Sequence, residues 1–69
     1  MRQQLTKILF INGYSYIGYC NITVNRKAEF VILTKKTKIN GRKHIYRVSY
    51  NFNQIKQIWI NDKEVQLWK

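Results

Sequence analysis

Polar and apolar residues alternate along much of the chain with the period of a β-strand. In residues 14–24 one parity holds apolar or small residues, while the other carries Ser15, Asn21 and Thr23. Successive side chains of a strand point to opposite faces, so this alternation predicts a strand with one buried face. Gly18 lies in its middle, where a missing side chain permits the bend or bulge that a small barrel needs at a corner.

Other short runs of β-branched and apolar residues, bounded by turn signals, predict the remaining strands. They cover residues 5–11, 30–34, 44–50, 55–60 and 64–68. The run 30–34 is apolar on both parities, so we place it centrally. No helical apolar stripe lasts more than two turns, and residues 51–54 are expected to form a turn or a single helical loop. The pattern predicts an all-β fold, a five- to six-stranded barrel of the SH3-like or OB kind with little or no helix.

Length and charge restrict what this barrel can do. Sixty-nine residues form one domain, 1–69, with no room for a separate catalytic lobe. Thirteen Lys and Arg against three acids give a net charge of +10, a repulsion that an anionic partner would relieve. A merely solubilising surface would mix both signs. Membrane binding would show a basic amphipathic helix or an apolar span, so nucleic acid is the expected partner and a membrane is not.

A basic hairpin is the strongest local signal. The segment 35–43, KKTKINGRK, places five cations around Asn40-Gly41, a dipeptide typical of two-residue hairpin turns. We expect strands 31–36 and 42–47 to pair through this turn and to hold the cations against phosphates, with affinity that falls steeply with salt. A mobile, solvated loop is the alternative.

Aromatic residues interleave with the basic ones. Ten aromatics exceed what so small a core encloses, and exposed rings stack on bases. Parity makes Tyr19 an outward ring, whereas Trp59 is expected in the core and Trp68 at an edge or a subunit contact. The candidate nucleic-acid-binding residues are Lys35, Lys36, Lys38, Arg42, Lys43, His44, Tyr46, Arg47, Tyr19, Arg26 and Lys27.

Several segments resemble the Sm-like family, which includes the LSm proteins and bacterial Hfq. In FINGYSYIGY the Asn12-Gly13 turn is followed by Gly18 with the spacing of the first Sm motif. FVIL, KHIYRVSY and IWINDKEVQL are similar to the third strand, the fourth strand and the second motif, so the resemblance spans roughly residues 7–67. It implies a small Sm-like barrel that assembles into rings and binds RNA, with Tyr46 and Arg47 matching the tyrosine and lysine of the fourth strand.

Catalysis and cofactors find little support in the sequence. His44 could transfer a proton, but it is a single histidine with no acid near it, so we expect no enzyme. A small ribonuclease toxin is the remote alternative. Cys20 lies on the apolar parity of its strand, which favours an inert core thiol. No ligand set for a metal is visible, and no cofactor is expected.

Two functions and several assembly states stay open. The leading prediction is a non-catalytic nucleic-acid-binding protein, with RNA or single-stranded DNA ahead of duplex DNA because aromatic β surfaces suit unstacked bases. The alternative is a small phage or mobile-element protein that binds a host enzyme or nucleoprotein, an origin compatible with the Ile-, Lys- and Asn-rich composition. Exposed strand edges favour a homo-oligomer, whereas repulsion between copies favours a dimer or a monomer. No signal-peptide pattern opens the chain, so the cytoplasm is the expected location.

Overall fold

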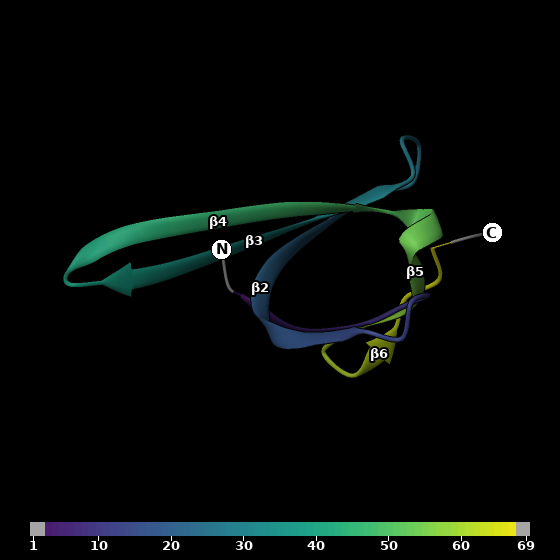
Figure 1. Cartoon of the computed structure of the whole chain (residues 1–69), viewed down its shortest axis with the longest axis horizontal. Helices are drawn as coiled ribbons and strands as arrows, with labels where there is room; N and C mark the ends of the chain where they lie inside the picture. Colours follow the sequence, from purple (N-terminus) through teal and green to yellow (C-terminus); the bar gives the residue numbers. More distant parts are fainter. Residues whose placement is uncertain (1–2, 68–69) are drawn as a thin grey trace.

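The computed structural model describes residues 3–67 and shows six antiparallel strands with one short 3₁₀ helix (Figure 1). They are β1 (Gln4–Phe10), β2 (Ser15–Asn25), β3 (Phe30–Ile39), β4 (Arg42–Asn51), the 3₁₀ helix η1 (Phe52–Gln54), β5 (Ile55–Ile60) and β6 (Lys63–Glu64). The strand order is β4-β3-β2-β1-β5-β6. The all-β prediction is therefore confirmed, and β3 lies inside the sheet as predicted.

Strand β2 belongs to both halves of the sheet. Its first part pairs with β1 as far as Gln4 opposite Cys20, and its second part pairs with β3 from Asn21 opposite Thr34 onwards. The strand thus changes partner between two consecutive residues, and the sheet curves around its own interior (Figure 1). This curvature lets one short sheet enclose a core without a second layer.

The sheet does not close into the predicted barrel. Within residues 3–67, β4 pairs only with β3, and β6 pairs only with β5, so the two edge strands do not meet. Strand β6 has two residues instead of the five predicted for 64–68, and residue 68 of that range lies outside the described residues. A strand this short provides too few backbone groups to form a ladder with β4.

The core lies on the concave side of the sheet. Ile8 and Ile58 face each other across β1 and β5 and are fully buried, as is the Cys20 thiol of β2. Phe52 of η1 is 1% exposed. The buried hydrophobic residues are Ile8, Cys20, Val31, Leu33, Phe52, Ile55, Ile58 and Leu67. Burial of this apolar surface is the main source of stability in a chain without disulfides.

Gly18 leaves space for an aromatic ring. A Cβ atom added at this glycine would lie 2.7 Å from the hydroxyl oxygen of Tyr16, two residues earlier on the same face. Burial raises the pKa of Tyr16 above its ordinary value, with smaller contributions from Cys20 and Tyr50. Gly18 does belong to the bent strand, but the change of partner follows Cys20, and the glycine itself accommodates the Tyr16 ring.

Trp59 lies on the exterior, contrary to the prediction that it belongs to the core. The register between β1 and β5 shifts between Leu9 and Phe10, which allows Ile55 and Ile58 both to point inward although their parities differ. Trp59 then stays on the outer face opposite Lys7, whose Nζ lies 5.7 Å from the ring centroid.

In the part of the chain that the structure describes, no helix is long and apolar enough to cross a membrane.

Candidate nucleic-acid interface

Residues 35–46 form a two-stranded arm that extends beyond the sheet. Strands β3 and β4 pair along their whole length, from Phe30 opposite Asn51 to Ile39 opposite Arg42, whereas β2 accompanies β3 only as far as Thr34. The molecule is therefore elongated, 42 Å along its longest axis and 22 Å along the others (Figure 1). Asn40 and Gly41 both have positive φ, so the predicted hairpin turn is confirmed.

One face of the arm, here called the lysine face, consists of Lys36, Lys38, Lys43, Ile45 and Arg47. Residues directly opposite each other in an antiparallel pair share a face, and Lys38 lies opposite Lys43 while Lys36 lies opposite Ile45. The three lysines and Ile45 line, with Thr37, a hollow of about 450 Å³. Ile45 is 62% exposed between the cations. The lysine face thus presents a shallow cationic site with an apolar floor.

The opposite face, here called the tyrosine face, follows the other parity of β4. It carries Arg42, His44 and Tyr46 on the arm and continues through Val48 to Tyr50 at the body of the protein. Lys35 lies opposite Tyr46 and adds a second cation to this face. The five cations of the segment 35–43 therefore do not form one surface, because strand alternation places three on one face and two on the other.

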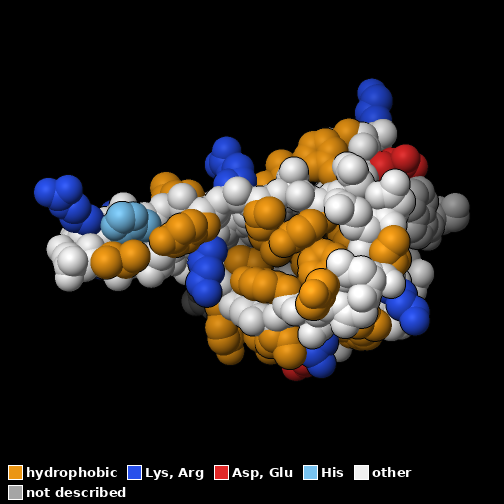
Figure 2. Space-filling view, in the orientation of Figure 1, with side chains coloured by type: hydrophobic (Ala, Val, Ile, Leu, Met, Phe, Trp, Pro, Cys, Tyr) orange, Lys and Arg blue, Asp and Glu red, His pale blue; other side chains and the backbone are white. Residues whose placement is uncertain are grey.

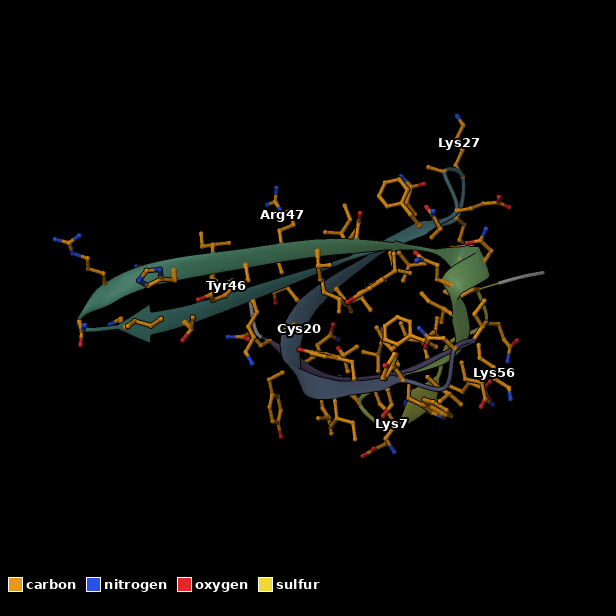
Figure 3. The ribbon with its side chains drawn as sticks, viewed as in Figure 1. Lys7, Cys20, Lys27, Tyr46, Arg47 and Lys56 are labelled. Atoms are coloured by element: carbon orange, nitrogen blue, oxygen red, sulfur yellow. The ribbon has the colours of Figure 1, made fainter. Side chains whose placement is uncertain are left out.

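The remaining predicted site residues divide between the interface and other parts of the molecule. Arg47 belongs to the lysine face at the base of the arm, and Lys27 projects from the β2–β3 turn on the same side (Figure 3). Tyr19 is 62% exposed, as predicted, but it lies on the exterior of the β1–β2 part of the sheet. That exterior also carries Lys7, which projects from the opposite side of the molecule to Arg47 (Figure 3).

Arg26 has a structural contact that the sequence did not predict. Its Nη1 atom donates hydrogen bonds to the backbone carbonyl of Gln66 at 2.6 Å and to that of Leu67 at 3.4 Å. The guanidinium group thereby connects the β2–β3 turn to the segment after β6. Arg26 therefore has a structural contact, and its role in the interface, like that of Lys27, stays a prediction.

No described carboxylate neutralises the arm. Glu29 lies in the β2–β3 turn at the far end of β3, and Asp62 and Glu64 lie in or next to the β5–β6 turn. On the face drawn in Figure 2 the arm carries cationic side chains and the single histidine, whereas the acidic side chains lie only on the body. Among residues 3–67 the arm cations have no ion-pair partner. Their field is therefore free to attract a polyanion.

A second hollow, here called the end pocket, lies where the β1–β2 turn meets η1. It measures about 430 Å³. The sequence identifies residues 12–13 and 51–54 only as turns, because a linear pattern does not show that the two segments meet in the fold. The lining residues are Phe10, Ile11, Asn12, Tyr14, Tyr50 and Gln54.

The described side chains show no cluster that could hold a metal ion. No group of three or more His, Cys, Asp or Glu residues gathers within residues 3–67, and Cys20 is buried. Comparisons of the chain with protein-family models, curated proteins and solved structures find no significant match. The resemblance to the Sm-like family therefore stays a prediction.

Proposed function

We propose that this chain is a non-catalytic nucleic-acid-binding protein whose arm lies against the phosphates of its partner. One observation carries the proposal: an exposed two-stranded ribbon with cations on both faces leaves the body of the protein, and no described carboxylate faces it. A solubilising surface does not need such a projection, since mixed charges on the body would suffice. A polyanion that follows the ribbon would contact several cations at once.

A bound phosphate would relieve the repulsion between neighbouring lysines of the arm. Like charges directly opposite each other in a β-ladder are destabilising, and Lys38 and Lys43 form such a pair. A phosphate seated in the hollow of the lysine face would be shared by Lys36, Lys38 and Lys43. Each contact of this kind releases counterions, so binding depends on salt rather than on sequence.

Exposed apolar and aromatic side chains favour a partner with unstacked bases, RNA or single-stranded DNA, over a duplex. Tyr46 is 55% exposed on one face of the arm, and Ile45 is 62% exposed on the other. Rings that stand free between cations provide stacking surfaces for bases, worth about 1 to 3 kcal/mol per base in known complexes. Duplex DNA hides the faces of its bases and would leave these side chains in water.

We further propose that the open sheet is a variant of the small SH3-like or Sm-like barrel. Support comes from the bent β2 shared between two halves of the sheet and from the single turn of helix that separates β4 from β5. Ring assembly of the Sm-like kind and a cytoplasmic location stay predictions. Light scattering with and without an oligonucleotide measures the assembly state directly.

The proposal is tested by fluorescence anisotropy with labelled oligonucleotides of about 16 nucleotides, titrated from about 50 to 200 mM salt. The variant Lys38→Gln/Lys43→Gln removes two arm cations. The control Lys56→Gln/Lys63→Gln removes two exposed lysines of the β5–β6 region and has the same net charge. We expect affinity to fall roughly 10- to 100-fold at about 50 mM salt in the first variant and much less in the control.

Equal losses in the two variants would contradict a role for the arm. Failure of the native chain to bind any oligonucleotide would contradict the function. The alternative of a protein partner is tested by adding a protein with an acidic surface as a competitor and measuring its binding to the arm. If it binds the arm and the oligonucleotides do not, the chain is an interaction protein instead.

A further inference from the structure

The end pocket combines aromatic walls with a rigid frame. The rings of Phe10 and Tyr50 lie with centroids 4.8 Å apart at 55° to each other, and Tyr14 is 75% exposed at the rim. The backbone N–H of Ile11 donates to the carbonyl of Gln54 at 3.1 Å, which joins the β1–β2 turn to η1. The pocket is therefore formed by two segments that are held together before any ligand arrives.

Two side-chain amides at this pocket are oriented by the backbone. The Oδ1 atom of Asn12 accepts a hydrogen bond from the backbone N–H of Tyr14 at 3.1 Å. The Oε1 atom of Gln54 accepts one from the backbone N–H of Asn51 at 2.9 Å. A backbone N–H can only donate, so both amide oxygens are assigned without ambiguity.

The two amides thus contribute hydrogen-bond donors to the pocket lining, beside the hydroxyl groups of Tyr14 and Tyr50, which can donate or accept. Each amide oxygen already accepts one hydrogen bond, and among residues 3–67 the NH₂ groups of Asn12 and Gln54 have no hydrogen-bond partner. Aromatic rings suit a flat, conjugated ligand, and NH₂ donors suit a ligand edge that bears carbonyl oxygens. Guanine, thymine and uracil present a carbonyl acceptor where adenine and cytosine present an amino donor.

We propose that the end pocket binds a keto base of an unpaired nucleotide, with the base against the aromatic rings and its carbonyl edge toward the NH₂ groups of Asn12 and Gln54. The proposal rests on the proposed function, because the arm supplies the affinity for the nucleic-acid backbone. It adds a selectivity that the arm alone lacks, since phosphate contacts carry no information about the base.

The tyrosine face connects the arm to the pocket. Arg42, His44, Tyr46, Val48 and Tyr50 alternate along one face of β4, and Tyr50 itself lines the pocket. At about 3.3 Å per residue, the row from Tyr46 to Tyr50 spans roughly 13 Å. Lys35 and Arg42 lie on this face of the arm, so a single strand that they hold can follow it and place one of its bases in the pocket.

The test compares oligonucleotides that differ only in the edge of the base. Deoxyinosine and deoxyadenosine oligonucleotides are purines that differ in a keto or an amino group, and oligo(dT) and oligo(dC) make the same comparison for pyrimidines. We expect the keto member of each pair to bind about fivefold tighter or more, the lower end of what good base contacts provide. Oligo(U) beside oligo(dT) separates an RNA source from a DNA source, and a keto preference within either sugar supports the pocket.

Variants then assign the selectivity to the two amides. Asn12→Asp/Gln54→Glu keeps both backbone hydrogen bonds but replaces each NH₂ donor with an acceptor, so the ratio of inosine to adenine affinity is expected to fall to one or to reverse. Asn53→Asp/Gln66→Glu adds the same charge at exposed positions and should keep the native ratio. Tyr14→Ala should weaken both oligonucleotides without changing the ratio, because it removes stacking surface from an exposed position.

The outcomes separate this inference from the proposed function. Equal affinity for inosine and adenine, with salt-dependent binding still lost in Lys38→Gln/Lys43→Gln, would overturn the pocket and leave the function standing. A changed ratio in the control Asn53→Asp/Gln66→Glu would also overturn the pocket, since charge alone would then explain the effect. Absence of binding to every oligonucleotide would overturn both.

Discussion

Lys38 and Lys43 lie directly opposite each other across the β3–β4 ladder, on the same face of the arm and one residue pair from its end pair, Ile39 and Arg42. Like charges directly opposite each other in a β-ladder repel, and no described carboxylate forms an ion pair with either lysine to offset that repulsion. The free protein therefore retains an unfavourable contact at the position where the proposed function requires the highest positive potential. A surface selected only for stability would carry an oppositely charged pair there.

Removal of this pair is expected to change stability and binding in opposite directions. Lys38→Gln/Lys43→Gln should raise the free energy of unfolding of the free protein by about 0.2 to 1 kcal/mol, the scale of a cross-strand pair. It should also make the slope of log affinity against log salt shallower by about 0.7 to 0.9, the value for the one phosphate shared in the hollow of the lysine face. Thermal unfolding and salt-titrated anisotropy measure the two quantities on the same samples.

Salt provides the internal control for this prediction. Added salt screens exposed charges, so the gain in stability should shrink between low and high ionic strength. The variant Lys56→Gln/Lys63→Gln removes no cross-strand lysine pair, because Lys63 lies opposite Ile60. A loss of stability in Lys38→Gln/Lys43→Gln would show that the two lysines are not in repulsion.

The arm should be dispensable for folding. The core ends at Leu33 on β3, and β2 accompanies that strand no further than Thr34. Replacing residues 36–45 with a single Asn-Gly turn joins Lys35 to Tyr46, two residues that already lie opposite each other. We expect a cooperative unfolding transition close to that of the native chain, because no residue of the core is removed.

The shortened chain should nevertheless lose most of its affinity for nucleic acid. It lacks Lys36, Lys38, Arg42 and Lys43, so its remaining charges lie mainly on the body. Circular dichroism verifies the fold, and anisotropy with the same labelled oligonucleotide measures the binding. Native affinity in a folded, shortened chain would place the interface on the body instead.

Local patterns predicted the strands and the hairpin well, because alternation and turn chemistry act between neighbours in sequence. The parity of β2 and the Asn40-Gly41 turn are both present in the structure. Closure of the barrel was predicted wrongly, since it depends on whether two edge strands meet in space, and β6 proved to be two residues long. Trp59 was misplaced because the register shift next to Phe10 reverses parity within β5.

The candidate site was predicted only in part, because its geometry depends on which segments meet in space. Charge density identified the arm from a linear segment, but the division of its cations between two faces follows from the pairing of β3 with β4. The end pocket was missed because Asn12 and Gln54 are 42 positions apart and meet only through the fold. The sequence does not show which donor will form a hydrogen bond with the side-chain oxygen of an Asn or Gln in a turn.

Arg26 is expected to act in stability and not in binding. Arg26→Gln removes the hydrogen bonds to the carbonyls of Gln66 and Leu67 and should lower the free energy of unfolding by about 1 kcal/mol. Lys27→Gln, its neighbour, makes the same change of charge at a position without such bonds. Urea unfolding compares the two variants, and anisotropy should show no larger loss of affinity for Arg26→Gln than for Lys27→Gln. A selective loss of affinity in Arg26→Gln with unchanged stability would instead place Arg26 in the interface.

Gly18 and Tyr16 should show strong coupling in a double-mutant cycle. A Cβ atom at residue 18 would lie 2.7 Å from the Tyr16 hydroxyl oxygen and 3.0 Å from the ring carbon that bears it, so Gly18→Ala must displace the ring. Such overpacking typically costs about 1 to 3 kcal/mol. Tyr16→Phe removes the closer of these contacts, so the double variant should recover part of the loss caused by Gly18→Ala alone. Urea unfolding of the four proteins of the cycle measures the coupling. Strict additivity of the two substitutions would show that the ring moves aside without cost, and the glycine would then not be needed for the packing of Tyr16.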